Sequence, residues 1–220
     1  REEMDAYSIE SLRRANAAIE NGAFAGEVVP VTFSTRAGEV TVEHDEQPGK
    51  GKPDKIPTLR PAFAKDGTIT AATSSSISDG AAAVVLTRES VAEKNGQTPV
   101  ARIVAMAAHA QAPSEFTVAP VGAINKVLEN AGWSADDVEL WEVNEAFACV
   151  AMFAMRDIGI PHDKINVNGG GTALGHPIGA SGTRIIVTLL NALKEQGKKR
   201  GIASLCIGGG EATAVAVELV

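Results

Sequence analysis

Aromatic residues and cysteines are scarce in this chain. Phe, Trp and Tyr make up 4% of its 220 residues, so the aliphatic side chains of Ala, Val, Ile and Leu must fill the core. The two cysteines, Cys149 and Cys206, are too few for a disulfide framework, which suits a reducing compartment, and we expect the cytoplasm. No apolar run approaches the roughly 18 residues of a membrane span, so we expect no membrane partner.

Positive charge is also in deficit. Lys and Arg number 20 against 27 Asp and Glu, and the net charge of −7 argues against nucleic-acid binding as the main task. One segment, 45–55, is locally basic through Lys50, Lys52 and Lys55, which fits either a solvated loop or a site for a small anion. His44, His109 and His162 show no metal-ligand spacing with each other or with cysteine, so we expect neither a metal nor a cofactor.

The chain is long enough for one large or two small domains. Apolar residues at helical spacing predict a helix over 1–20, and since no cap precedes Arg1 we expect a longer protein, cut or processed upstream. Residues 36–38 suggest a hairpin between short strands at 28–33 and 39–43.

Further on, strands and helices alternate, which predicts an α/β layered sheet. We expect strands near 68, at 81–86 (buried on both faces), 100–108, 138–143, 164–168, 202–207 and 212–219, and helices at 88–93, 121–131, 144–158 and 181–196, the last capped by Ser181.

The most unusual stretch is 166–182, which contains six glycines and one histidine, His176. Glycine lets backbone approach a ligand closely, and Pro177 stiffens the loop around the imidazole. The glycine spacing does not match a Rossmann fingerprint, and no Gly-Lys-Ser/Thr follows, which excludes a P-loop. A purely structural turn is the other interpretation, but the concentration of glycines favours a reactive loop.

Two further blocks could carry chemistry. Asn144 follows a predicted strand, where it either caps a helix or holds a water or carbonyl with its amide. Cys206 precedes three glycines, whose bare N–H groups could form an oxyanion hole, although a free cysteine is usually buried and inert, as we expect for Cys149. If Asn144, His176 and Cys206 each follow a strand of one sheet, a thiol with a near-neutral pKa and an imidazole could transfer protons next to a carbonyl.

These blocks, in this order, resemble the signature blocks of the thiolase family. They read Asn-Glu-Ala-Phe-Ala from Asn144, the glycine-rich stretch 166–182, and Cys-Ile-Gly-Gly-Gly from Cys206. The resemblance runs along the whole chain, and within the family it is strongest to the acetyl-CoA acetyltransferases. It implies an acyltransferase of fatty acid metabolism that interconverts two acetyl-CoA with acetoacetyl-CoA and CoA, the coenzyme A thioesters being substrates.

The resemblance also implies roles for individual residues. Cys206 would be the acid/base, His176 would activate a nucleophilic cysteine, Asn144 would hold a water in the same oxyanion hole, and the Gly208 amide would serve a second hole. Other positions would contact the substrate: Ser75, Ala71 and Phe63 along the pantetheine, and Ala146, Phe147 and Phe116 along the acyl end.

The implied architecture is the layered αβαβα fold of thiolases. Residues 1–77 would be the second half of the coenzyme A-binding loop domain, 78–97 a return segment of the N-terminal domain, and 98–220 the C-terminal domain. The family's nucleophilic cysteine lies in its N-terminal half, which has no counterpart here, so we expect that half as a partner and the chain alone to be inactive. Without it, the run 81–86 would be exposed. A homo-oligomer, dimer or tetramer, is also expected.

Two alternatives stay open. The protein could be a thiolase of longer or branched 3-ketoacyl-CoA substrates, or a non-catalytic thiolase-like subunit that binds acyl-CoA.

Overall fold

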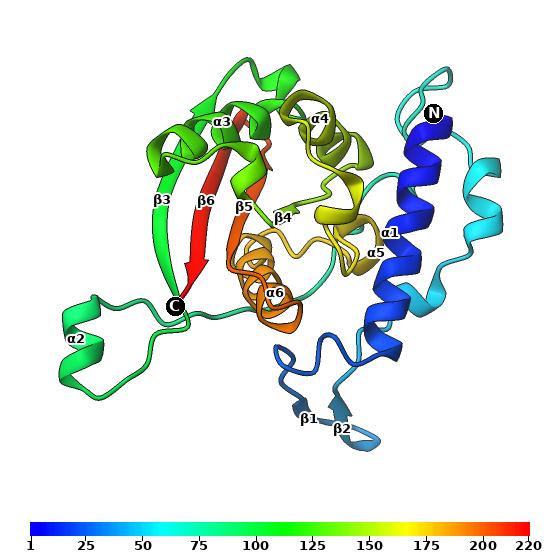
Figure 1. Cartoon of the computed structure of the whole chain (residues 1–220). Helices are drawn as coiled ribbons and strands as arrows, with labels where there is room; N and C mark the ends of the chain where they lie inside the picture. Colours follow the sequence, from blue (N-terminus) through cyan, green and yellow to red (C-terminus); the bar gives the residue numbers. More distant parts are fainter.

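A four-stranded mixed sheet lies at the centre of the computed structural model, which describes residues 1–220 (Figure 1). The strands are β3 (Ala101–Ala110), β4 (Leu140–Val143), β5 (Arg200–Ile207) and β6 (Glu211–Leu219), in the order β3-β6-β5-β4. The β4–β5 pair is parallel, and β6 runs antiparallel to both β5 and β3. The β5–β6 hairpin is therefore the middle of the sheet, and β4 joins it at one edge.

Helices cover both faces of this sheet because side chains alternate along each strand. Trp141 and Ile202 face the helices α3 (Ala119–Ala131) and α4 (Ala148–Ile158). Their neighbours Leu140 and Ala203 face the other way, onto Ile185, Leu189 and Leu193 of α6 (Ser181–Glu195). Aliphatic residues fill both layers, as the composition requires, and the result is a three-layer α–β–α unit.

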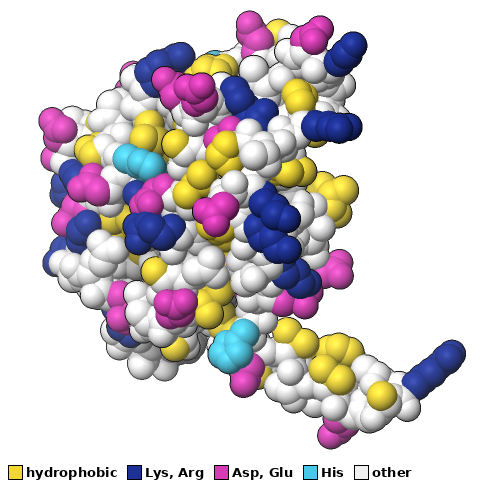
Figure 2. Space-filling view, turned by 90° about the vertical axis from the view of Figure 1, so that its right-hand side faces the viewer, with side chains coloured by type: hydrophobic (Ala, Val, Ile, Leu, Met, Phe, Trp, Pro, Cys, Tyr) yellow, Lys and Arg dark blue, Asp and Glu magenta, His cyan; other side chains and the backbone are white.

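The remaining elements lie outside this unit, on different sides of it (Figure 1). Helix α1 (Glu2–Glu20) packs against the short α5 (Gly171–Leu174), and α2 (Glu89–Lys94) stands apart in a long excursion (Figure 1). The hairpin β1 (Val31–Thr35) and β2 (Gly38–Val42) projects from the body as an arm with exposed hydrophobic side chains (Figure 2). Short 3-10 turns occupy 48–50, 53–58, 113–115, 135–137 and 162–164. None of the helices combines the length and apolar character needed to cross a membrane.

Most predicted elements are confirmed. The first helix, the 31–42 hairpin, the short helix after Arg88, α3, α6 and the strands β3 to β6 all lie within a few residues of their predicted positions. Ser181, however, does not cap α6. It is the first helical residue, after Ala180 at the N-cap, and its hydroxyl donates back to the Pro177 carbonyl instead.

The strand predicted over 164–168 is wrong, and the reason is a side chain. Asn166 has a positive φ of 46°, which ends any extended run, and only Ile165 forms a bridge, to Trp141. The Asn166 amide takes the place of the strand backbone: its Oδ1 accepts from the Val143 N–H at 2.9 Å, and its Nδ2 donates to the Val143 carbonyl at 2.8 Å. A side chain thus completes the edge of β4.

The helix predicted from Asn144 begins four residues later, at Ala148. The Asn144 N–H instead continues the sheet by donating to the Ser204 carbonyl at 2.9 Å. The N–H of Ala148 donates to the Thr73 carbonyl, so a distant segment satisfies the start of α4. Asn144 is therefore not a helix cap.

The apolar run 81–86 does not form the expected buried strand. It pairs with no other strand, and the side chains of Val85 and Leu86 are 94% and 72% exposed. Residues near 68 form no strand either, only a bridge between Thr70 and Pro61. The prediction that 81–86 would be exposed without partner strands is confirmed.

Candidate active site

A serine-rich segment, 73–78, brings two of the three blocks together. The Ser75 N–H and hydroxyl both donate to the Ala146 carbonyl, at 3.0 and 3.1 Å. Farther along the segment, the Ser76 carbonyl accepts from the His176 N–H at 3.0 Å, and Ile77 and His176 form a parallel bridge. The turn after Asn144 and the loop of His176 therefore lie on either side of this segment.

Asn144 lies at the end of β4 with its side chain 1% exposed. Neither its Oδ1 nor its Nδ2 makes a hydrogen bond within the chain. A buried amide without a partner is costly, which is characteristic of a group that serves a ligand or a bound water. This observation favours the functional interpretation of Asn144 over the structural one.

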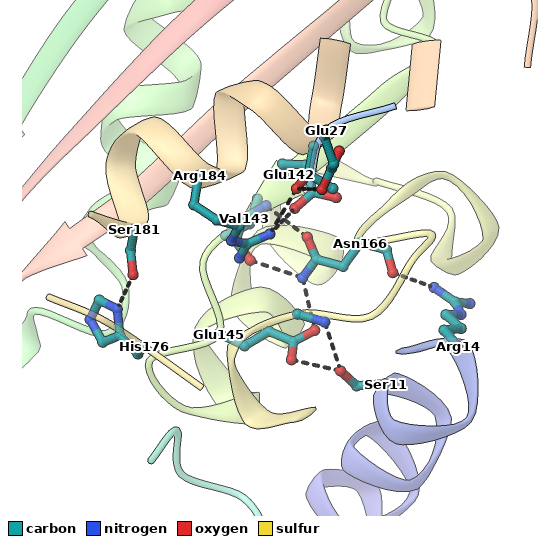
Figure 3. Close-up of polar contacts among 12 residues, drawn as sticks. Ser11, Arg14, Glu27, Glu142, Val143, Glu145, Asn166, His176, Ser181 and Arg184 are labelled. Atoms are coloured by element: carbon teal, nitrogen blue, oxygen red, sulfur yellow. Dashed lines mark hydrogen bonds and ion pairs between the residues drawn. The ribbon is translucent and has the colours of Figure 1, made fainter. Parts of the chain in front are cut away.

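His176 is half-buried, and its ring orientation is fixed by Ser181 (Figure 3). The Nδ1 nitrogen lies 2.5 Å from the Ser181 Oγ, which itself lies 3.0 Å from the Pro177 carbonyl. Burial, and secondarily the positive charge of Arg184, lowers the pKa of the imidazole, so the ring is neutral at pH 7. The expectation that His176 follows a strand is wrong: it follows α5 and Gly175.

Cys206 is buried near the end of β5, where it pairs with Ala212 and belongs to the aliphatic core beneath α3 and α4. Burial raises the pKa of its thiol to about 11, so the expected near-neutral thiol is wrong for this chain. A neutral thiol is poised to donate a proton. Cys149 is also partly buried with a raised pKa, which agrees with an inert thiol.

Backbone donors follow Cys206 in the β5–β6 turn. The N–H groups of Gly208 and Gly209 donate no hydrogen bond within the chain, whereas the Gly210 N–H bonds the Ile207 carbonyl. Two free N–H groups close to a thiol fit the predicted oxyanion-hole role of Gly208. Because Asn144 bonds Ser204 of the same strand, this turn and the Asn144 block share one corner of the sheet.

The predicted substrate-contacting residues are only partly brought together. Phe147 forms the centre of an aromatic group, with ring centroids 6.0 Å from both Phe63 and Phe116. Ser75 contacts Ala146 as described, while Ala71 is exposed. No three His, Cys, Asp or Glu side chains converge as a metal-ligand set.

Sequence reasoning missed Glu145. Its side chain is 0% exposed, and its carboxylate accepts hydrogen bonds from α1, from Asn166 and from α5. The only sequence signal was an acidic residue next to Asn144 in an otherwise apolar block, which alone does not distinguish a buried carboxylate from a surface one.

Comparison with known proteins agrees with this geometry. The family model for the thiolase C-terminal domain matches residues 97–219, and the model for the thiolase N-terminal domain matches residues 1–90. The chain belongs to the thiolase family. It is 50% identical over 220 residues to an acetyl-CoA acetyltransferase of Yarrowia lipolytica, covering 100% of this chain and 55% of that protein.

Solved thiolases show the same fold. The Bacillus anthracis acetyl-CoA acetyltransferase superposes with a TM-score of 0.97 at 42% identity, and the Acat5 thiolase of Ascaris suum, solved in complex with coenzyme A, with 0.90 at 38%. In both cases this thiolase chain is covered completely, and 56% of the other chain is matched. The chain thus spans about half the length of the relatives it matches.

Proposed function

We propose that this chain carries the acid/base side of a thiolase active site, which interconverts two acetyl-CoA with acetoacetyl-CoA and CoA. The observation that carries the proposal is the linkage of the three blocks: segment 73–78 bonds both the His176 loop and the turn after Asn144, and Asn144 bonds Ser204, two residues before Cys206. The Asn144 amide beside them is buried and without a partner. The named activity of its relatives and the coenzyme A complex of one of them support the same substrate class.

The roles follow from the protonation states. In thiolysis, a nucleophilic cysteine attacks the 3-keto carbon of acetoacetyl-CoA, and the C–C bond breaks to leave an acetyl-enzyme and a carbanion. Neutral Cys206 delivers its proton to that carbanion, giving acetyl-CoA. The resulting thiolate then takes the proton of CoA as its sulfur attacks the acetyl-enzyme. Condensation is the reverse sequence.

The other two blocks stabilise charge. His176 is neutral, and because Ser181 holds its Nδ1–H, the Nε2 is free to take the proton of the nucleophilic thiol. Asn144 holds a water that donates to the thioester oxygen, and the Gly208 N–H stabilises the tetrahedral oxygen of the acyl-enzyme. Phe147 with Phe63 and Phe116 lines the acyl and pantetheine path.

The nucleophilic cysteine belongs to the N-terminal thiolase half, which lies outside these 220 residues. Two apolar surfaces would receive it: the exposed run 81–86, and a groove beside α6. The groove is lined by Met106 of β3, Ile185 and Ile186 of α6, and Leu205 and Val215 of the sheet. Covering both would complete the αβαβα layering, and the completed unit would act as a cytoplasmic dimer or tetramer in fatty acid metabolism.

The test combines the chain with its N-terminal half and measures cleavage of acetoacetyl-CoA by CoA. Cys206→Ala should lower kcat by about 10²–10⁴-fold. Full activity of this variant would overturn the assigned role. Isolated chain incubated with acetyl-CoA should show no added acetyl group by intact mass spectrometry, because its two cysteines are a buried acid and an inert thiol.

Two measurements separate the alternatives. A rate profile over acyl-chain length distinguishes an acetoacetyl-CoA thiolase from one acting on longer or branched substrates. If no co-purifying polypeptide supplies a nucleophilic cysteine and the complex binds CoA without turnover, the protein is a non-catalytic acyl-CoA-binding subunit.

A further inference from the structure

Glu145 is a fully buried carboxylate with no cation bonded to it. It accepts five hydrogen bonds, all from neutral donors at 2.7–3.1 Å. Oε1 accepts from the Tyr7 hydroxyl and the Asn166 amide; Oε2 accepts from the hydroxyls of Ser11 and Thr172 and from the Thr172 N–H. A buried charge is tolerated when its lone pairs are satisfied in this way, although it is too costly to be retained merely to fill the core.

The five donors join three segments that are far apart in the chain. Tyr7 and Ser11 belong to α1, Asn166 ends the edge of β4, and Thr172 lies in α5. Figure 3 shows Ser11 and Asn166 on either side of Glu145. Ser11 extends the network, because its hydroxyl also accepts from the Gly170 N–H at 3.0 Å. Glu145 therefore holds the turn before α5 in place from one side and the end of β4 from the other.

The site residues on either side depend on this turn. The backbone of Gly171 lies against the Asn144 block, since a Cβ on Gly171 would be 2.8 Å from the Glu145 carbonyl and 3.4 Å from the Asn144 Oδ1. Helix α5 then leads through Gly175 to His176. A shift of the Gly170–Thr172 turn would consequently move the surroundings of the Asn144 amide and the start of the His176 loop together.

Both carboxylate oxygens of Glu145 act as acceptors in this network. Glutamine would place an NH₂ group on one side of the site. At the Oε2 position it would face the Thr172 N–H, which can only donate. At the Oε1 position it would face the Asn166 NH₂ group. The Asn166 amide cannot flip to offer its oxygen instead, because that oxygen already accepts from the Val143 N–H. In either orientation, the new NH₂ group would point at another N–H donor and neither group would have an acceptor.

We infer that Glu145 is a positioning residue of the active site, whose carboxylate fixes the Asn144 amide and the Gly170–Thr172 turn relative to each other. The expected effect of Glu145 on catalysis rests on the proposed function. Its effect on the position of the Gly170–Thr172 turn does not. Glu145 touches none of the reacting atoms and acts through Asn144 and His176.

The test uses Glu145→Gln in the chain combined with its N-terminal half. We expect kcat for acetoacetyl-CoA thiolysis to fall about 10–100-fold, as for outer residues that orient reactive ones, with KM changed less than about twofold. Glu129→Gln, an exposed carboxylate on α3, is the matched control and should leave both constants unchanged. A wild-type kcat in Glu145→Gln would overturn the inference.

Hydrogen exchange gives a second readout that does not depend on activity. In the 220-residue chain, Glu145→Gln should speed exchange of the Gly170 and Thr172 amides while the β5–β6 amides stay protected.

Two milder variants serve if Glu145→Gln does not fold. Thr172→Val and Tyr7→Phe each remove one hydroxyl donor to Glu145 and add no new N–H group. Each should lower kcat several-fold, and unchanged kcat in both would overturn the inference. If the wild-type protein lacks thiolase activity, the proposed function fails. Faster exchange of the Gly170 and Thr172 amides in Glu145→Gln would still show that Glu145 holds this turn in place.

Discussion

The Nδ1 of His176 and the Oγ of Ser181 form a 2.5 Å hydrogen bond between the glycine-rich loop and the first residue of α6. Because the Ser181 proton points to the Pro177 carbonyl, which can only accept, the imidazole must supply the proton of the shared bond. The neutral ring is therefore the Nδ1–H tautomer, and Nε2 is the basic nitrogen. A helix start determines which nitrogen of His176 can react.

Ser181→Ala should lower kcat for acetoacetyl-CoA thiolysis about 5–10-fold in the combined protein, because a lost hydrogen bond of about 1–1.5 kcal/mol frees the tautomer and rotation of the ring. Ser134→Ala is the control: it removes a serine hydroxyl bond to Asp137 at a 3-10 turn away from the site and should leave kcat unchanged. An unchanged kcat in Ser181→Ala would show that the ring is held by other contacts.

Gly170→Ala should destabilise the chain, because its backbone lies directly against the Glu145 carboxylate. A Cβ there would be 2.5 Å from Oε1 and 2.8 Å from Oε2, and the buried carboxylate cannot swing away from its five donors. We expect a loss of about 1–3 kcal/mol in the free energy of unfolding, measured by urea titration. Gly179→Ala, in the same glycine-rich stretch, meets nothing within 4 Å and should be near neutral. Equal effects of the two variants would contradict this account.

Glu142 predicts a pH dependence of stability. The side chain is 2% exposed, and burial, only partly offset by Arg184 at 3.4 Å, raises its pKa to about 8. In the unfolded chain the pKa of Glu is about 4.3. Between these values the folded state keeps a proton that the unfolded state has lost, so the free energy of unfolding falls as the pH rises.

Urea titrations at several pH values between about 4.5 and 8 measure this slope. We expect Glu142→Gln to flatten it and to stabilise the chain at pH 8, on the order of a few kcal/mol. Glu27, whose pKa burial also raises, contributes in the same direction and leaves a residual slope. A wild-type slope in Glu142→Gln would mean that Glu142 is ionised throughout.

The exposed run 81–86 should make the isolated chain self-associate, because an unpaired apolar segment is available to other chains. Leu86→Lys should lower the associated fraction in sedimentation velocity, at equal protein concentration. Thr87→Lys is the control, since it adds the same charge next to the run without removing an apolar side chain. If the two variants behave alike, charge rather than the apolar run governs association.

Local signals were enough for most elements. The helical spacing of 1–20, the turn at 36–38 and the alternation along β5 and β6 each fix a period that no tertiary contact overrides. Two errors lie where a distant group replaced a local one: the Asn166 side chain pairs with Val143 in place of a strand, and Thr73 accepts the hydrogen bond that starts α4. The third error is local, because Ser181 bonds backward to the nearby Pro177 carbonyl rather than capping α6.

The sequence by itself determined the family and the three blocks that carry the resemblance, because each block is a short-range pattern of residues. Only the tertiary structure decided the states of those groups. Burial under α3 and α4 makes Cys206 a neutral thiol, Ser181 selects the tautomer of His176, and five donors from three segments hold the Glu145 carboxylate. The pKa of Cys206 and the buried Glu145 carboxylate depend on neighbours far along the chain, which folding alone brings into contact. The tautomer of His176 depends on Ser181, five residues on, and on the loop geometry that places its hydroxyl beside the ring.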